Sequence, residues 1–248
     1  MTEAVECSHK ALVPVYGVPM LVRVVRSLRT RPEIASIAVS IDDPSTLDGV
    51  PELRDMVAEG SLHVHESLDS PSSSVSDYLG RLPAGVPLLV TTADHALLTS
   101  EMIGHFWVNA AASEADLVVG LVAGSDFRRE FPEQPRTLIP LGDDTFSGAN
   151  LFAFKGPAAA KVADFWVRAE RHRKKPWRLV GMFGLVNLGL FVARRLDLES
   201  AMKRASKRIG ARIEAVVMPF PECAIDVDKP SDLELARRIL AQRGDRAA

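Results

Sequence analysis

The sequence predicts a doubly wound α/β fold, with three layers (α/β/α) built around a mostly parallel sheet. Apolar strand-like runs alternate with amphipathic helical runs through about the first 125 residues, which is the element order of a parallel sheet with right-handed crossovers. The chain has 248 residues, of which 47% are hydrophobic, so it can build a substantial core. We expect a single domain over residues 1–248, with a helical insertion over residues 157–209.

Hydrophobic periodicity predicts the elements of the first half. Residues 18–29 place apolar side chains on one face and Arg23, Arg26 and Arg29 on the other, as an amphipathic helix requires. Strands are predicted at IASIAVSID, SLHVHE, PLLVTT and ADLVVGLVAG. Helices are predicted over residues 51–60 and 75–82, and another begins at Thr99.

The second half is richer in helices. Charges and prolines between Ser125 and Asp144, around a short LIPL strand, indicate an insertion, and SGANLFAF returns to strand character. Helical spacing over residues 157–171, 179–193 and 197–209 predicts the helical insertion. ARIEAVVMP predicts a strand, ECAIDVDKPSD a loop around a short strand, and LELARRILAQRG the final helix.

Composition excludes several function classes. The net charge of −2 gives no overall basic field, so we expect small-molecule ligands and no nucleic acid. Cys7 and Cys223 lack metal-ligand spacing, which argues against a disulfide framework or a structural zinc site and favours a reducing, cytoplasmic location. Residues 1–10 lack the apolar core of a signal peptide, and the longest apolar stretch, residues 179–193, is shorter than a membrane span of about 20 residues.

Three segments contain residue types suited to phosphate and metal chemistry. Lys10 precedes a turn and the amino end of a helix, which attracts anions. Asp94 follows the PLLVTT strand, where open α/β sheets place catalytic groups. Asp226 and Asp228 lie two apart in an extended segment, so both point to one face and can share a magnesium ion with Asp94. Glu222 is a further candidate ligand.

Each of these residues also has a structural interpretation. Taken alone, Lys10 is better explained as an exposed cation beside a turn. For Asp94, a cap on the helix at Thr99 explains the residue as well as a metal site does, and for Asp228 so does a role in the turn before the last helix. His95 is better explained as a structural or solvent-facing residue. Convergence is the deciding feature: three carboxylates brought together without a metal ion or a proton would repel strongly, so their convergence would imply magnesium or an equivalent ion.

The segments HKALVPVYGVPML, TTADHALLT and AIDVDKPSDL, in this order and spacing, resemble the nucleotidyltransferases of the GT-A-like fold. Molybdenum cofactor guanylyltransferases and sugar-nucleotide pyrophosphorylases belong to that group. The resemblance covers roughly residues 8–155 and 211–240. It implies the nucleotide-diphospho-sugar transferase type of fold, Mg²⁺ as the cofactor, and transfer of a nucleoside monophosphate from an NTP to a small, phosphorylated or hydroxylated acceptor with release of pyrophosphate.

The resemblance also implies roles for particular residues. Lys10 matches the lysine that contacts the nucleotide phosphates, and Asp94 matches the aspartate that binds magnesium. For the second metal ligand we expect Asp226 first and Asp228 second. The implied nucleotide-binding positions are Lys10, Pro14, Ser72, Ser73, Ser74, Thr92 and Ala93. Gly148 and Asn150 fall where relatives contact the acceptor, although a turn or packing role is the better explanation of Asn150.

One part of the family pattern has no counterpart here. The family begins with a strand followed by LAGGxGxRM, and this sequence matches only from Lys10 onward. We expect the true start to lie roughly 15 to 25 residues upstream, because a sheet without a central strand would expose unpaired edges. The alternatives are a non-catalytic relative that binds nucleotide without turnover, and a nucleotide-sugar-dependent glycosyltransferase in which Asp226 and Asp228 form a metal-binding DxD.

RHRKKPWR, followed by the apolar LVGMFGLVNLGLFVA, lies outside the resemblance. A helical subdomain that packs on the sheet or forms a homodimer interface is the favoured interpretation. Contact of residues 171–193 with a membrane surface is the less favoured one.

Overall fold

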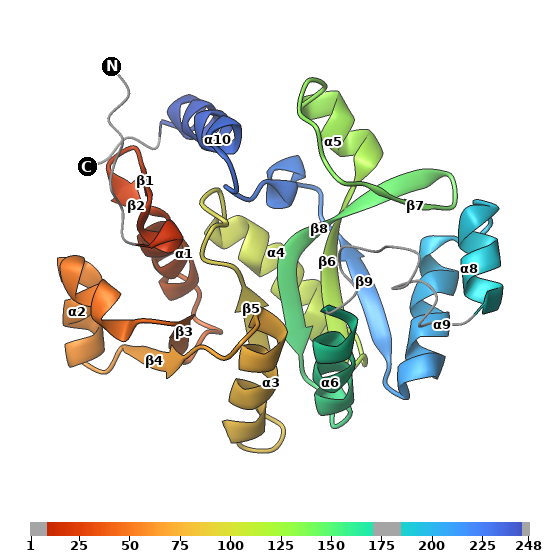
Figure 1. Ribbon diagram of the computed structural model, residues 1–248, viewed down its shortest axis with the longest axis horizontal. Coiled ribbons are helices and arrows are strands. Elements are labelled where there is room, and N and C mark those ends of the chain that lie inside the picture. Colours follow the sequence, from red (N-terminus) through yellow and green to blue (C-terminus); the bar gives the residue numbers. More distant parts are fainter. Residues whose placement is uncertain (1–8, 171–184, 245–248) are drawn as a thin grey trace. The chain divides into compact units, whose positions relative to one another are not determined.

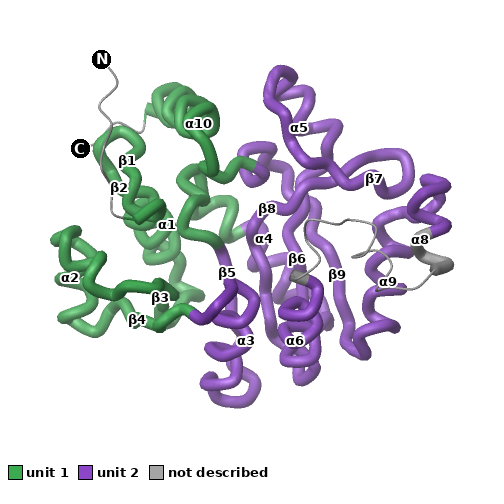
Figure 2. The backbone as a smooth tube through the Cα atoms, viewed as in Figure 1, with its two compact units in different colours: residues 1–67, 92–104, 225–248 green, residues 68–91, 105–224 purple. Residues whose placement is uncertain are grey.

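The computed structural model describes residues 9–170 and 185–244, which form two compact units. Unit 1 comprises residues 1–67, 92–104 and 225–248, and unit 2 comprises residues 68–91 and 105–224 (Figure 2). The chain therefore leaves unit 1 and returns to it twice. The expectation of a single folding domain stays a prediction.

Unit 1 contains a short antiparallel hairpin, a parallel strand pair and the helices around them (Figure 1). Its elements are η1 (Lys10–Leu12), β1 (Pro14–Val15), β2 (Val18–Pro19), α1 (Met20–Arg29), β3 (Ile37–Ile41), η2 (Pro44–Gly49), α2 (Pro51–Ala58), β4 (Leu62–Glu66), the start of α4 (Ser100–Ala112) and α10 (Pro230–Gln242). Tyr16 and Gly17 make the hairpin turn with φ of 51° and 72°, a pair of positive values that matches the twist of a two-residue β-hairpin.

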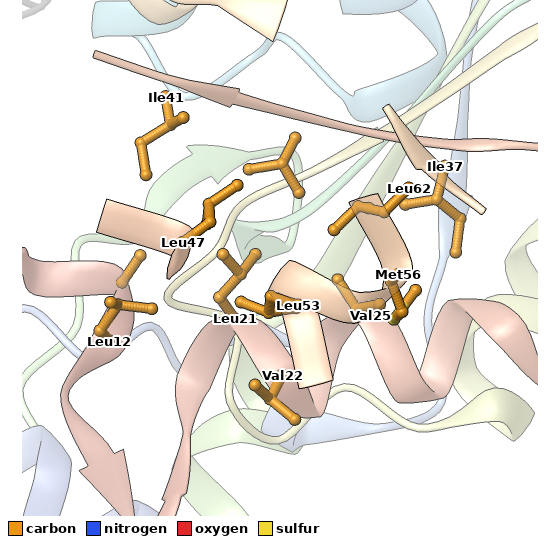
Figure 3. Close-up of a cluster of buried hydrophobic side chains, with 12 residues drawn as sticks. Leu12, Leu21, Val22, Val25, Ile37, Ile41, Leu47, Leu53, Met56 and Leu62 are labelled. Carbon is orange, nitrogen blue, oxygen red and sulfur yellow. The ribbon is translucent and has the colours of Figure 1, made fainter. Parts of the chain in front are cut away.

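The core of unit 1 is built from α1, α2 and the β3–β4 pair. The apolar face predicted for α1 is buried, with Leu21, Val22 and Val25 in the cluster shown in Figure 3. β3 and β4 run parallel, with Ile37 opposite Leu62, and both side chains join the same cluster. This core supports η1 and the hairpin, and so it fixes the position of Lys10.

Unit 2 contains a five-stranded sheet and several helices. Its elements are α3 (Pro71–Arg81), β5 (Leu88–Thr91), the rest of α4, β6 (Leu117–Ala123), α5 (Gly124–Glu130), β7 (Ile139–Leu141), β8 (Asp144–Phe154), α6 (Ala159–Glu170), α8 (Leu185–Val192), α9 (Leu198–Ile209), β9 (Ile213–Val217) and η3 (Pro221–Ala224). The strand order is β5-β8-β6-β9, with β7 on β8. Four of the five strands share one direction, because β8 is antiparallel to β5, β6 and β7 while β9 is parallel to β6. The predicted α/β class with a mostly parallel sheet is confirmed.

The structure corrects four details of the sequence-based elements. The charged segment around Ser125 contains the helix α5. The short strand expected near Asp226 is absent, because η3 ends at Ala224 and residues 225–228 have no regular secondary structure. Helix α3 begins at Pro71 because Ser70 caps it, its Oγ accepting a hydrogen bond from Ser73 N. α10 likewise begins earlier than predicted, at Pro230, which suits the first turn of a helix.

The exposure of β5 is a further difference. Its apolar run predicts a fully buried strand, yet all four of its residues are partly exposed. Among the described strands β5 pairs only with β8, so it forms an edge of the sheet. In the described parts of the chain, no helix combines the length and apolar character needed to cross a bilayer.

Candidate active site

The candidate site lies within unit 1, and its central cation is Lys10. This residue opens the short helix η1, which is anchored by the buried side chains of Ala11 and Leu12. His9 caps η1, with its Nδ1 accepting a hydrogen bond from Ala11 N at 3.2 Å. The anchor is apolar and the lysine is half exposed, so the fold holds the backbone and leaves the ammonium group accessible.

Lys10 joins two carboxylates that are far apart in sequence. Its Nζ donates to Asp94 Oδ2 and to Asp228 Oδ1, both at 2.5 Å. One positive and two negative charges leave the cluster with a net charge of −1. Such a cluster has a residual attraction for a further cation.

Backbone hydrogen bonds hold Asp94 in place. Its carbonyl oxygen accepts from Val227 N at 3.1 Å, which ties the turn after β5 to the segment that contains Asp228. The next residues along the chain are buried, and His95 N donates to Thr92 O at 3.2 Å. The two carboxylates are thereby positioned by one backbone connection between their segments.

Asp228 is positioned by Asp232, a residue that the sequence analysis did not select. Asp232 Oδ2 accepts hydrogen bonds from Asp228 N at 3.2 Å and from Lys229 N at 3.1 Å, at the amino end of α10. An acidic residue in the first turn, after a Pro at the helix start, is a recognised helix-start signal. That signal in DKPSD could have identified Asp232 from the sequence.

The protonation of Lys10 follows from these contacts. Partial burial lowers its pKa, but the hydrogen bonds to Asp228 and Asp94 outweigh this effect, and the pKa is raised above its ordinary value. Lys10 is therefore a full cation at neutral pH, which suits a group that binds phosphate.

The expected convergence of three carboxylates is not found. Among residues 9–170 and 185–244, no group of three or more His, Cys, Asp or Glu side chains is arranged to hold a metal ion. Asp226 is half-buried, and the two hydrogen bonds of Lys10 go to Asp94 and Asp228 instead. In the structure, the positive charge between Asp94 and Asp228 is that of Lys10. Glu222 lies in η3 of unit 2.

Asp94 and Asp228 nevertheless fit a magnesium ion. Their oxygens converge on one cationic atom, Lys10 Nζ, and carboxylate oxygens are the ligand type that Mg²⁺ takes in proteins. One or two carboxylates together with substrate phosphates are its usual environment. The donor set is thus suitable for a magnesium ion that arrives with a nucleotide.

Three of the other predicted nucleotide-binding residues lie in unit 1. Pro14 is in β1, and Thr92 and Ala93 come directly before Asp94. Ala93 packs against the core of unit 1. Thr92 Oγ1 is buried without a hydrogen-bond partner in the described part of the protein, so it is a polar atom that a ligand group can satisfy.

The three predicted serines lie in the first turns of α3, in unit 2. Ser72 and Ser74 are buried, and Ser74 Oγ accepts from Leu68 N at 2.8 Å, so these two side chains have structural roles. Ser73 is partly exposed and lines a surface pocket of about 360 Å³ together with Ser76. Ser73 is therefore the one of the three that is best placed to meet a ligand.

Gly148 and Asn150 lie in β8 of unit 2, at an irregularity in the sheet. The pairing of β6 with β8 shifts register between Val119 and Leu121, and Asn150 has a positive φ of 49°. A side chain added at Gly148 would meet no atom within 4 Å. Bulges and strained non-glycine residues of this kind cluster at functional sites.

Comparison with known proteins identifies a family model and several related structures. The model for the MobA-like NTP transferase domain matches residues 6–174. A solved structure described as a hypothetical transferase from Thermus thermophilus is 28% identical, with a TM-score of 0.72 and 90% of each chain covered. No match was found among curated proteins.

Two further solved structures are similar to this chain in fold, at low sequence identity. A CMP:2-keto-3-deoxy-manno-octonic acid synthetase complexed with CTP is 15% identical, with a TM-score of 0.57, and the match covers 94% of this chain and 92% of the other. A 4-diphosphocytidyl-2C-methyl-D-erythritol synthase from Anaerococcus prevotii is 12% identical, with a TM-score of 0.57 and 93% of each chain covered.

Proposed function

Because the chain belongs to the MobA-like NTP transferase domain family, we propose that it is a magnesium-dependent nucleotidyltransferase of the EC 2.7.7 type. The reaction transfers a nucleoside monophosphate from an NTP to a small, phosphorylated or hydroxylated acceptor. The observation that carries the proposal is the placement of Lys10 Nζ between Asp94 and Asp228, at 2.5 Å from each.

The roles of the three residues follow from charge. Lys10, a full cation, binds the triphosphate and stabilises the negative charge that builds up on the oxygens of the α-phosphate. Asp94 and Asp228 orient Lys10, and they are the residues that would hold Mg²⁺. When bound, magnesium supplies neutralisation of phosphate charge. Positioning and charge neutralisation account for most of the catalysis in reactions of this kind.

The bond changes are simple. An oxygen of the acceptor attacks the α-phosphorus of the NTP, the bond from that phosphorus to the bridging oxygen breaks, and pyrophosphate leaves with the bond's electrons. A hydroxyl acceptor loses its proton to solvent during the reaction, whereas a phosphorylated acceptor attacks through an anionic oxygen and has no proton to lose.

The remaining binding roles are assigned to residues with suitable surroundings. Ser73, Thr92 and Pro14 are assigned to the nucleotide, and Gly148 and Asn150 to the acceptor. Thr92 is supported by its buried hydroxyl, and Asn150 by its strained backbone. The cytoplasm, where NTPs and phosphorylated metabolites are present, is the proposed location.

The test is release of pyrophosphate from each of the four common NTPs with Mg²⁺ and a panel of sugar phosphates and polyol phosphates. CTP comes first, because one of the similarly folded proteins is complexed with it. Asp94→Asn is the matched inactive control and should lower the rate by at least about a hundredfold. An Asp94→Asn protein with full activity would refute the assignment, and nucleotide binding without pyrophosphate release would favour a non-catalytic binding protein.

A further inference from the structure

The segment from α8 to α9 has a charge balance unlike that of the whole chain. Residues 185–209 contain six Lys and Arg residues against two acidic ones, a net charge of +4, whereas the chain as a whole has a net charge of −2. The proposed chemistry of the nucleotide site uses none of these residues. The segment lies entirely within unit 2.

Helix α8 is apolar and partly exposed to solvent. Its sequence, LVNLGLFV, contains no charged residue. Val192 has 73% of its surface exposed, the highest value among the large hydrophobic residues of the described chain, and Leu190 and Phe191 are half-buried. A helix of eight residues is about 12 Å long, so it can lie on a bilayer but cannot cross one.

Two arginines are fixed at the carboxyl end of α8. Arg194 has a φ of 55°, its N–H donates to Phe191 O at 3.0 Å, and Arg195 N donates to Leu190 O at 2.8 Å. This is the hydrogen-bond pattern of a Schellman helix ending, in which the chain turns sharply. The cations are therefore adjacent to the apolar helix, at the end where the helix dipole favours positive charge.

Helix α9 adds a row of exposed cations. Its buried residue Ala205 packs into the core of unit 2, together with Met202 and Ile209. The residues on the other side of the helix are exposed, namely Lys203, Arg204, Lys207 and Arg208. Positions three and four apart share a helix face, so this spacing places the four cations on one surface.

We propose that the α8–α9 segment binds the surface of a membrane that contains anionic lipids. The exposed side chain of Val192, with those of Leu190 and Phe191 beside it, enters the boundary between headgroups and acyl chains, and the cations of the segment contact the headgroups. A nucleic-acid site is disfavoured, because such sites combine cations with stacking aromatic and hydrogen-bonding groups, whereas α8 offers exposed aliphatic surface.

The experiment is co-sedimentation of the full chain with vesicles of phosphatidylcholine alone, or of phosphatidylcholine mixed with phosphatidylglycerol. We expect binding to the mixed vesicles at low salt, weaker binding at high salt because ions screen the charges, and no binding to phosphatidylcholine. Lys207→Gln with Arg208→Gln should raise the lipid concentration for half-binding by about thirtyfold. Val192→Asp should raise it by about tenfold or more.

The matched control is Arg237→Gln with Arg238→Gln, which removes two exposed cations from α10 and should leave vesicle binding unchanged. Circular dichroism and thermal melting of each variant separate loss of binding from loss of fold. The proposal is overturned if mixed vesicles are not bound at low salt, if the α10 variant loses as much binding as the α9 variant, or if the segment binds duplex DNA and not vesicles. No nucleotide is present, so the result is independent of the proposed enzymatic activity.

Discussion

Exchanging Asp228 for asparagine gives the sharpest test of the candidate site. The structure places Asp228 Oδ1 at 2.5 Å from Lys10 Nζ, and Asp226, two residues earlier, does not share this contact. Asp228→Asn and Asp226→Asn are therefore matched variants. They remove the same charge from the same loop, but only the first removes a partner of Lys10.

The expected magnitudes differ for stability and for activity. The side chains of Asp228 and Lys10 are 64% and 46% exposed, so loss of this ion pair should lower the free energy of unfolding by at most about 1 kcal/mol. Loss of a preorganised electrostatic group from an active site typically lowers kcat by about 10²–10³, or roughly 2.7–4 kcal/mol of transition-state stabilisation. Asp228→Asn should thus be folded and nearly inactive.

The assay is pyrophosphate release with the NTP and acceptor identified by screening, alongside urea unfolding of each variant. Asp226→Asn should keep its kcat within about tenfold of the wild type, since it leaves the contacts of Lys10 intact. The reasoning is refuted if Asp228→Asn retains wild-type kcat, or if Asp226→Asn loses activity while Asp228→Asn does not.

Three further predictions concern Lys10, the α1–α2 contact and a tight turn. Lys10→Met should raise the affinity for Mn²⁺ in the absence of nucleotide, because Asp94 and Asp228 lose their counter-ion. It should also lower the affinity for NTP, because the cation that binds phosphate is removed. Unchanged Mn²⁺ binding in an EPR titration would contradict the prediction. The hydrogen bond from Arg26 lowers the pKa of Glu52, so at neutral pH the wild type should be more stable than Glu52→Gln by at most about 1 kcal/mol. This difference in the free energy of unfolding should disappear as the pH falls through the lowered pKa, because Glu52 is then uncharged. A difference that persists in urea melts at acid pH would count against this reasoning. Gly156→Ala should lower the free energy of unfolding by about 1–3 kcal/mol or more, because the added Cβ would lie 2.8 Å from the backbone of Asp116. A variant as stable as the wild type in thermal melts would show that the turn relaxes.

The sequence determined the class of fold because its signals there are local. The apolar face of α1 and the apolar run of β6 could each be identified from periodicity, and both are buried as expected. The segments containing Lys10 and Asp94 were also identified locally, since Lys10 precedes a turn and a helix and Asp94 follows an apolar strand. The start of α3 was missed because the cap at Ser70, and not apolar periodicity, sets it.

Only the tertiary structure decided which residues meet. Lys10 is 84 residues from Asp94 and 218 residues from Asp228, and no local pattern fixes contacts across such separations. The sequence favoured Asp226 over Asp228 as the second ligand, but it is Asp228 that meets Lys10. Two hydrogen bonds hold the Asp228 segment in place, from Asp228 N to Asp232 Oδ2 and from Val227 N to Asp94 O. The sequence thus supplied the charges and the fold class, and long-range packing decided which of those charges share one site.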